Sequence, residues 1–189
     1  MDTTIELTRR RFTVKEYHRM IEVGLLTKRD RVELLAGDIV EMAPIGDPHA
    51  GTVDRITRLF VQALGNRVIV RVQGPVLLAV VESEPQPDLA LLSPQADFYT
   101  SRRPEPADIL LLVEVMDTSA ARDRRVKLPL YARAGIVETW LVDVNTNQVE
   151  IHRRPGSGGY QETRMLQRGD RLAIEAFPDL PLSVADLLG

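Results

Sequence analysis

A run of eight residues, Ile109–Met116, is apolar except for the carboxylate of Glu114. A short apolar run bounded by turn residues predicts a strand that is buried on both faces, and such a strand requires a sheet covered on both sides. An ionised carboxylate that is removed from water in this way is costly unless a cation meets it. Two partners are open for Glu114 at this point: an arginine and a bound metal ion.

The composition is typical of one globular domain over residues 1–189, with 44% hydrophobic and 27% charged residues. The chain has no cysteine, which excludes disulfides, thiolate metal ligands and a cysteine nucleophile. With only three histidines, a His-rich zinc centre is disfavoured. Oxygen atoms are therefore the expected ligands of any metal.

The formal net charge of −3 argues against a protein that coats nucleic acid through its overall charge. Local basic clusters at 9–11, 28–31 and 122–127 leave individual phosphate contacts open, although each is more typical of a solvated surface. The N-terminal segment lacks the apolar core of a signal peptide, and no apolar run approaches the roughly 18 residues of a membrane span. We expect a soluble, cytoplasmic protein that does not bind membranes.

Hydrophobic periodicity predicts an α/β fold in which a mixed sheet is flanked by helices. Thr13 and Glu16 have capping-box spacing at the start of the first helix, and Pro129 should kink or split the third. The expected helices are 13–24, 47–64, 118–134 and 182–189. The expected strands are a hairpin within 30–44, then 67–72, 75–81, one starting at Asp88, 109–116, 137–144, 148–154, 160–166 and 170–176.

Asp88 and Glu114 each lie on an apolar strand, and neighbouring strands would bring their side chains together. Two carboxylates about 4 Å apart repel by roughly 4 kcal/mol at an effective dielectric constant near 20, so one must be protonated or both must bind a cation. Mg²⁺ suits the pair because it takes one or two carboxylates and keeps several waters. Glu33, on the first hairpin, could supply a third acid directly or through water.

Metal-assisted cleavage of a phosphodiester would also need a cation that orients the attacking water and offsets charge as the pentavalent phosphorus forms. Lys127 is the candidate for this cation. Asp123, Lys127 and Tyr131 recur every four residues and would share one face of a regular helix. The simpler alternative is an exposed ion pair of Asp123 with Lys127 beside a core tyrosine. The spacing alone leaves both interpretations open.

Two segments, "PQPDLALL" and "LLLVEVM", together resemble the split active site of the PD-(D/E)XK nuclease superfamily. More closely, "VELLAGDIVEMAP", "PDLALL", "LLVEVMDTS", "RDRRVKLPLYARAGIVETWLVD" and "FPDLPLSVADLLG" resemble in their order the bacterial Uma-two family of restriction-endonuclease-like domains, from about Phe12 to the C-terminus. This resemblance implies an αβββαβ core with a β-rich C-terminal extension. It also implies Mg²⁺, with Mn²⁺ as the alternative, at Asp88, Glu114 and the Val115 carbonyl.

The same resemblance places Glu33 and His49 at the edge of the site and implies homodimers. One departure is Met116, which stands where the superfamily has a lysine, and Lys127 on the next helix would take that role. A second departure is the segment 117–119, Asp-Thr-Ser, where family members often have Ser-Pro-Ser. The extra acid could change the charge of the site.

Two functions are therefore expected from the sequence. The first is a Mg²⁺-dependent DNA endonuclease in which Asp88, Glu114 and Val115 hold the metal and Lys127 orients water. The alternative is a catalytically inactive nucleic-acid- or protein-binding module with the same fold. A small-molecule hydrolase is unsupported, because the chain lacks a serine nucleophile elbow, a phosphate-binding glycine loop and a zinc motif.

Overall fold

The computed structural model describes residues 9–27 and 29–189, and its centre is a six-stranded sheet. The described helices are α1 (Val14–Glu22), α2 (Asp47–Leu64), α3 (Ala120–Arg122), α4 (Leu128–Ala134) and α5 (Val184–Leu188). The strands are β1 (Val32–Leu35), β2 (Asp38–Glu41), β3 (Ile69–Val72), β4 (Leu89–Leu92), β5 (Ile109–Met116), β6 (Glu138–Asp143), β7 (Gln148–Gly156), β8 (Gly159–Gln167), β9 (Arg171–Leu172) and β10 (Leu182–Ser183).

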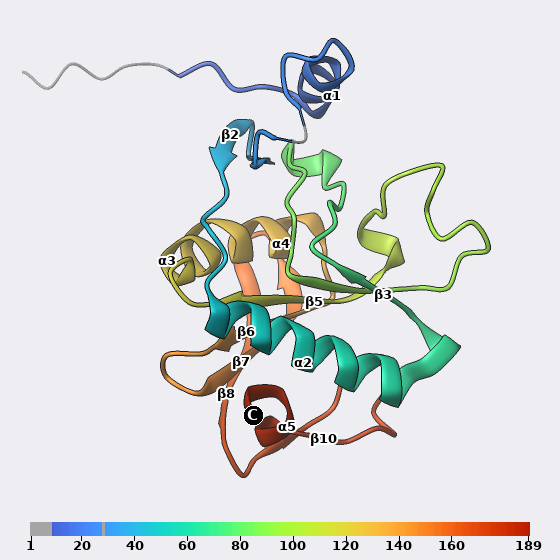
Figure 1. Ribbon diagram of the computed structural model, residues 1–189, viewed down its shortest axis with the longest axis vertical. Coiled ribbons are helices and arrows are strands. Elements are labelled where there is room, and N and C mark those ends of the chain that lie inside the picture. Colours follow the sequence, from blue (N-terminus) through green and yellow to red (C-terminus); the bar gives the residue numbers. More distant parts are fainter. Residues whose placement is uncertain (1–8, 28) are drawn as a thin grey trace, which may run out of the picture.

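The sheet has the order β3–β4–β5–β6–β7–β8, with β3 and β8 at its edges (Figure 1). Only β5 and β6 pair in parallel, and α3 and α4 supply the crossover that a parallel pair requires. The series α2, β3, β4, β5, α4, β6 is the expected αβββαβ core, and β7 and β8 begin the β-rich extension. The predicted fold is confirmed. Within the described ranges, no helix has both the length and the apolar character needed to cross a membrane.

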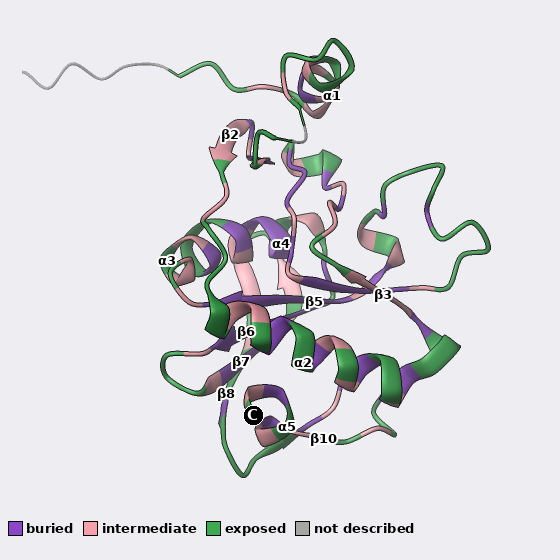
Figure 2. Ribbon diagram, viewed as in Figure 1, coloured by how far each residue is buried: buried purple, intermediate pink, exposed green. Residues whose placement is uncertain are grey.

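Each face of β5 packs into a different part of the core, which explains why the strand is almost entirely apolar. Leu111, Val113 and Val115 belong to the cluster formed with α2, whereas Leu112 packs with Tyr131 of α4. Figure 2 shows β5 as buried along nearly all of its length, with Leu110 partly exposed, and the buried residues of α2 belong to the core cluster on the sheet. Because side chains alternate along a strand, Glu114 faces the α4 side.

Pro129 splits the third helix as the sequence predicts. The π-helical turn Asp123–Lys127 separates α3 from α4, and α4 ends at Gly135, whose φ is +83°. Proline cannot donate the backbone hydrogen bond that would continue a regular helix through this point. The widened turn buries Asp123 and Lys127 while the residues between them stay exposed.

The strand expected at 75–81 does not form. Only Ala79–Val81 is regular, as a 3₁₀ turn, and Leu78 makes one isolated bridge. The segment lies beside a stretch that contains Pro85 and Pro87, which lack the N–H groups needed for a continuous ladder. Val76 and Leu78 are buried, whereas Val80 is exposed, so the segment has the composition of a strand without the hydrogen bonding of one.

The strand expected at 170–176 is shortened to the two residues of β9. Arg153 Nη2 donates to the Ala173 carbonyl (2.6 Å), and the Glu175 N–H donates to Glu138 Oε2 (2.7 Å). Side chains of the main sheet thus satisfy the backbone groups that a longer ladder would have used.

Replacement of Phe60 by alanine tests the core between α2 and the sheet. Phe60 is fully buried, and its ring centroid lies 6.0 Å from that of Trp140. We expect a loss of about 3–5 kcal/mol in the free energy of unfolding, because the mutation leaves a cavity. Urea denaturation would measure it. Val61→Ala, at the adjacent position that is 53% exposed, should change stability by no more than about 0.5 kcal/mol; similar values for both variants would contradict this assignment of the core.

Candidate active site

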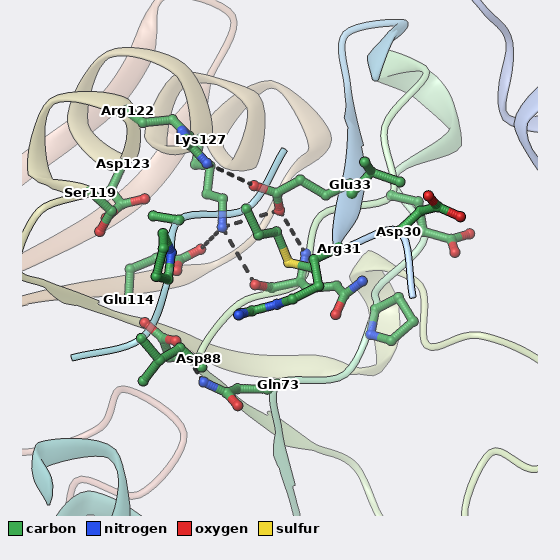
Figure 3. A pocket seen from close by; sticks show the side chains of 18 of the residues that line it. Asp30, Arg31, Glu33, Gln73, Asp88, Glu114, Ser119, Arg122, Asp123 and Lys127 are labelled. Atoms are coloured by element: carbon green, nitrogen blue, oxygen red, sulfur yellow. Dashed lines mark hydrogen bonds and ion pairs between the residues drawn. The ribbon is translucent and has the colours of Figure 1, made fainter. Parts of the chain in front are cut away.

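A cavity of about 590 Å³ lies between the N-terminal hairpin, the start of β4, the end of β5 and the turn that precedes α4. Figure 3 shows the acidic and basic side chains converging on it. All five side chains that the sequence singles out line this cavity: Glu33, His49, Asp88, Glu114 and Lys127.

The helix α1 and the hairpin close one side of the cavity. The expected capping box of Thr13 and Glu16 is present at the start of α1. Tyr17 of that helix donates from its hydroxyl to the Val32 carbonyl (3.3 Å), and His18 pairs with the buried Glu84. These contacts fix the wall that carries β1 and Glu33.

Asp88 is held at the point where β4 begins. The antiparallel register pairs Leu89 with Val113, so the next step places Asp88 opposite Glu114. The Val115 N–H donates to Asp88 Oδ2 (2.8 Å), and His49 Nε2 lies 3.0 Å from the same oxygen. Oδ1 has only a long contact of 3.5 Å with the side-chain amide of Gln73.

Glu114 is buried, with 2% of its surface exposed. Its Oε1 accepts a hydrogen bond from the Tyr131 hydroxyl and lies 3.2 Å from Lys127 Nζ. Burial holds the pKa of Glu114 well above its usual range, and Lys127 opposes this shift. Within the protein, Glu114 therefore has two partners, Lys127 and Tyr131. The apolar run alone had left an arginine and a metal ion as the alternatives.

Lys127 joins two walls of the cavity, because its Nζ lies 3.2 Å from Glu33 Oε2 and 3.2 Å from Glu114 Oε1. The Gln86 carbonyl is a weaker third partner at 3.4 Å. Burial alone would lower the pKa of Lys127, but the surrounding carboxylates, led by Glu114 and Glu33, raise it above its usual value. The side chain is a buried ammonium.

The exposed ion pair of Lys127 with Asp123 that the sequence suggests as an alternative is wrong. Asp123 is buried and accepts a hydrogen bond from the Ser119 hydroxyl, and its contacts within 4 Å include no Lys or Arg among the described residues. Burial raises its pKa, with Lys127 acting in the opposite direction. The π-helical turn explains the difference, since it redirects Lys127 from a helix surface into the cavity.

Glu33 and His49 each support another member of the cluster. Glu33 is buried on β1, accepts from the Gln86 N–H (3.0 Å) and lies 3.9 Å from Arg122. His49 lies near the start of α2, and its hydrogen bond to Asp88 raises its pKa above the usual value despite partial burial. His49 Nδ1 is the one buried side-chain polar atom in the described ranges that lacks a hydrogen-bond partner.

The donor atoms suit a hard divalent cation. Asp88 Oδ1 is only loosely engaged, and Glu114 Oε2 accepts no hydrogen bond from a described residue. A pair of carboxylates with room for waters is the usual protein contribution to a Mg²⁺ site. In the described part of the chain, no three His, Asp or Glu side chains converge as a ready-made metal cage. The Val115 side chain lies in the core, and its amide is bonded to Asp88.

Two side chains in the cavity were not assigned a role from the sequence. Gln73 follows β3 and contacts Asp88, but a single glutamine beside a glycine gives no recognisable signal. Arg31 lines the cavity and extends across it (Figure 3), and the sequence marks it only as one of a basic cluster. The neighbouring Lys28 of that cluster lies outside the described residues.

The sheet order and the acid–lysine cluster agree with the restriction-endonuclease-like fold that the sequence resembles. The solved structure described as "a putative nuclease belonging to DUF820", from Anabaena variabilis, matches with a TM-score of 0.71. The match covers 94% of this chain and 97% of that chain at 14% sequence identity, so it establishes the fold.

A family model, "Uma2: Putative restriction endonuclease", matches residues 14–185. The chain therefore belongs to the Uma2 family, as the resemblance in its sequence indicates. No match was found among curated proteins.

Proposed function

We propose that this protein is a Mg²⁺-dependent endonuclease, with Mn²⁺ as the alternative metal, that hydrolyses DNA phosphodiester bonds. The observation that carries the proposal is the meeting of Asp88, Glu114 and Lys127 in one cavity, on elements as far apart in the chain as β4 and the turn before α4. Asp88, Glu114 and the Val115 carbonyl would hold the metal. When bound there, Mg²⁺ would polarise a phosphoryl oxygen and lower the pKa of a water ligand.

The charge of the cavity supports a need for added cations. Its lining carries seven carboxylate side chains but only four from lysine or arginine, so the empty cavity would repel a phosphodiester. Lys127 places a proton donor beside Glu114, where it can orient water and offset negative charge in the transition state. Arg31 has no carboxylate partner within 4 Å among the described residues and is free to bind a phosphate oxygen.

Glu33 and His49 are positioning residues in this proposal. Glu33 holds Lys127 from the side opposite Glu114, and His49 holds the inner oxygen of Asp88. Both arrangements leave Asp88 Oδ1 and Glu114 Oε2 without a close donor among the described residues. Neither residue needs to touch the substrate.

One observation supports the alternative, a nucleic-acid-binding module without activity. Lys127 and Tyr131 already compensate Glu114, and His49 and the Val115 N–H already bind Asp88, so the cluster is balanced by protein groups alone. Such a cluster can persist as a structural element. The two functions differ in whether the protein cuts DNA.

Supercoiled plasmid separates them. We expect nicking and linearisation with Mg²⁺ or Mn²⁺, none with EDTA, and none with Glu114→Gln under any condition. Single-stranded DNA and RNA of matched sequence would show whether the substrate is restricted to duplex DNA. If the parent cuts no substrate with either metal but shifts DNA in a gel, the binding-module function is the better one.

Assembly is a separate proposal. The nine-residue strand β8 is an edge of the sheet, so its outer backbone groups are available to pair with another strand. We propose a homodimer on that basis. Light scattering at micromolar concentration should give twice the monomer mass; a monomer mass would contradict the proposal. A cytoplasmic location stays a prediction from the sequence.

A further inference from the structure

A second group of cations lies next to the cavity, along the edge strand β3. Ile69 of this strand packs into the cluster on the α4 side of the sheet, and the alternation of side chains puts Arg71 on that same side. Gln73, two residues further, contacts Asp88. Two residues of a strand span about 7 Å, so Arg71 stands one short step from the acid pair.

Arg71 is held in place by three contacts. Its Nη2 donates to the Phe98 carbonyl (3.1 Å), and its guanidinium carbon lies 5.6 Å from the centroid of the Tyr99 ring. Its aliphatic stem lies against Gly74, where an added Cβ would come within 2.7 Å of the arginine Cδ. Gly74 thus leaves the space in which this arginine is positioned.

The charge of Arg71 is not neutralised. Among the described residues no carboxylate lies within 4 Å of it, and its pKa is lowered by burial and by the nearby charge of Arg103. Arg103, which lines the cavity, has Glu84 (3.4 Å) as its one carboxylate partner among the described residues, and Glu84 is already paired with His18. Arg71, which has no carboxylate near it in the described part of the chain, and Arg103, whose partner Glu84 is shared with His18, together offer cationic groups for an anion.

The turn whose Phe98 carbonyl contacts Arg71 also carries an exposed aromatic side chain. Phe98 is 65% exposed at a φ of +52°, and the Asp97 carboxylate braces the turn through the N–H groups of Tyr99 and Ser101. Exposed aromatic rings and cationic side chains are the groups with which proteins stack bases and bind the backbone of single-stranded nucleic acid.

We infer that Arg71 and Arg103 bind a backbone phosphate of the DNA strand next to the phosphate that is cleaved, and so guide that strand from the cavity along β3. The inference rests on the proposed function in taking nucleic acid as the substrate. We assign the ligand to nucleic acid, a polyanion, because Arg71 lies two residues along the chain from Gln73, which contacts Asp88, and Arg103 lines the same cavity as the acid pair. The inference requires no metal at the arginines.

Binding can be measured apart from cleavage with Glu114→Gln as the background and EDTA present. The probe is a short fluorescein-labelled duplex DNA, followed by anisotropy over a series of salt concentrations. Adding Arg71→Ala should weaken binding equally for unrelated sequences and reduce the slope of log K against log salt by about 1. Arg58→Ala, an exposed arginine on α2, which covers the opposite face of the sheet, should leave affinity and slope unchanged.

Gly74→Ala gives a second test at constant charge. The added methyl group should displace the Arg71 side chain and weaken DNA binding, while Arg71→Lys should retain the salt slope. Thermal unfolding of each variant shows that the fold is retained. Equal affinities for the Arg71→Ala and Arg58→Ala proteins would overturn the inference even if the parent cuts DNA. A selective loss with Arg71→Ala would uphold the binding site even if the parent cuts nothing, in which case only the proposed activity fails.

Discussion

Lys127→Met should reduce DNA cleavage by about 10²–10³-fold, which is the usual cost of removing one preorganised charge-stabilising group. The same variant should lose about 3–5 kcal/mol of stability, because it leaves two carboxylates in a buried site without their cation. The Lys127 side chain is only 7% exposed, and Glu33 and Glu114 both lie 3.2 Å from its Nζ. Plasmid nicking and urea denaturation would measure the two effects.

The two effects can be separated. Lys127→Met combined with Glu33→Gln removes the ammonium and one of its two acids, so it should recover part of the stability while the rate stays low. Arg125→Met changes an exposed cation in the same π-helical turn and should alter neither property. If Lys127→Met nicks plasmid as fast as the parent at a temperature where both are folded, Lys127 has no catalytic role.

The sequence predicts those parts of the fold that local rules determine. The α2 helix runs from Asp47 to Leu64 as expected, because a proline at its start and Gly65 at its end bound a clear apolar stripe. Pro129 indicates correctly that the third helix is interrupted. The pattern fails at 75–81, where apolar residues suit a strand but the prolines across from them prevent a ladder.

The sequence correctly predicts which five side chains line the cavity, but it predicts only some of the contacts between them. Apolar strands that carry Asp88 and Glu114 indicate that the two acids can meet, and the register of β4 with β5 then places them opposite each other. Spacing of four along a helix suggests an exposed Lys127, and only the π-helical turn shows that this residue is buried. The positions of Arg71 and Gln73 depend on the packing of β3 at the sheet edge, which no local pattern records.

Asp88→Asn should lower Mn²⁺ or Mg²⁺ affinity by more than the roughly 10–100-fold that is typical of residues behind a metal ligand, because it removes a direct charge. The asparagine oxygen can still accept the Val115 N–H, so stability should change little. Asp88→Ala should instead destabilise the fold by about 1–3 kcal/mol, since that buried N–H loses its acceptor.

Calorimetric titration with Mn²⁺ would measure the affinity, and Asp54→Asn, an exposed acid on α2, is the matched control. The metal-free protein gives an independent readout through His49, whose pKa is raised chiefly by its hydrogen bond to Asp88. A raised pKa in the folded state contributes stability below the unfolded value of about 6.5, and this contribution is lost as pH rises through the folded pKa. As the pH rises from about 6.5 through the folded pKa of His49, the parent protein should therefore lose more stability than the Asp88→Asn variant. Unchanged Mn²⁺ affinity in Asp88→Asn would place the metal elsewhere, whereas an unchanged His49 titration would show that the hydrogen bond between His49 and Asp88 does not form in solution.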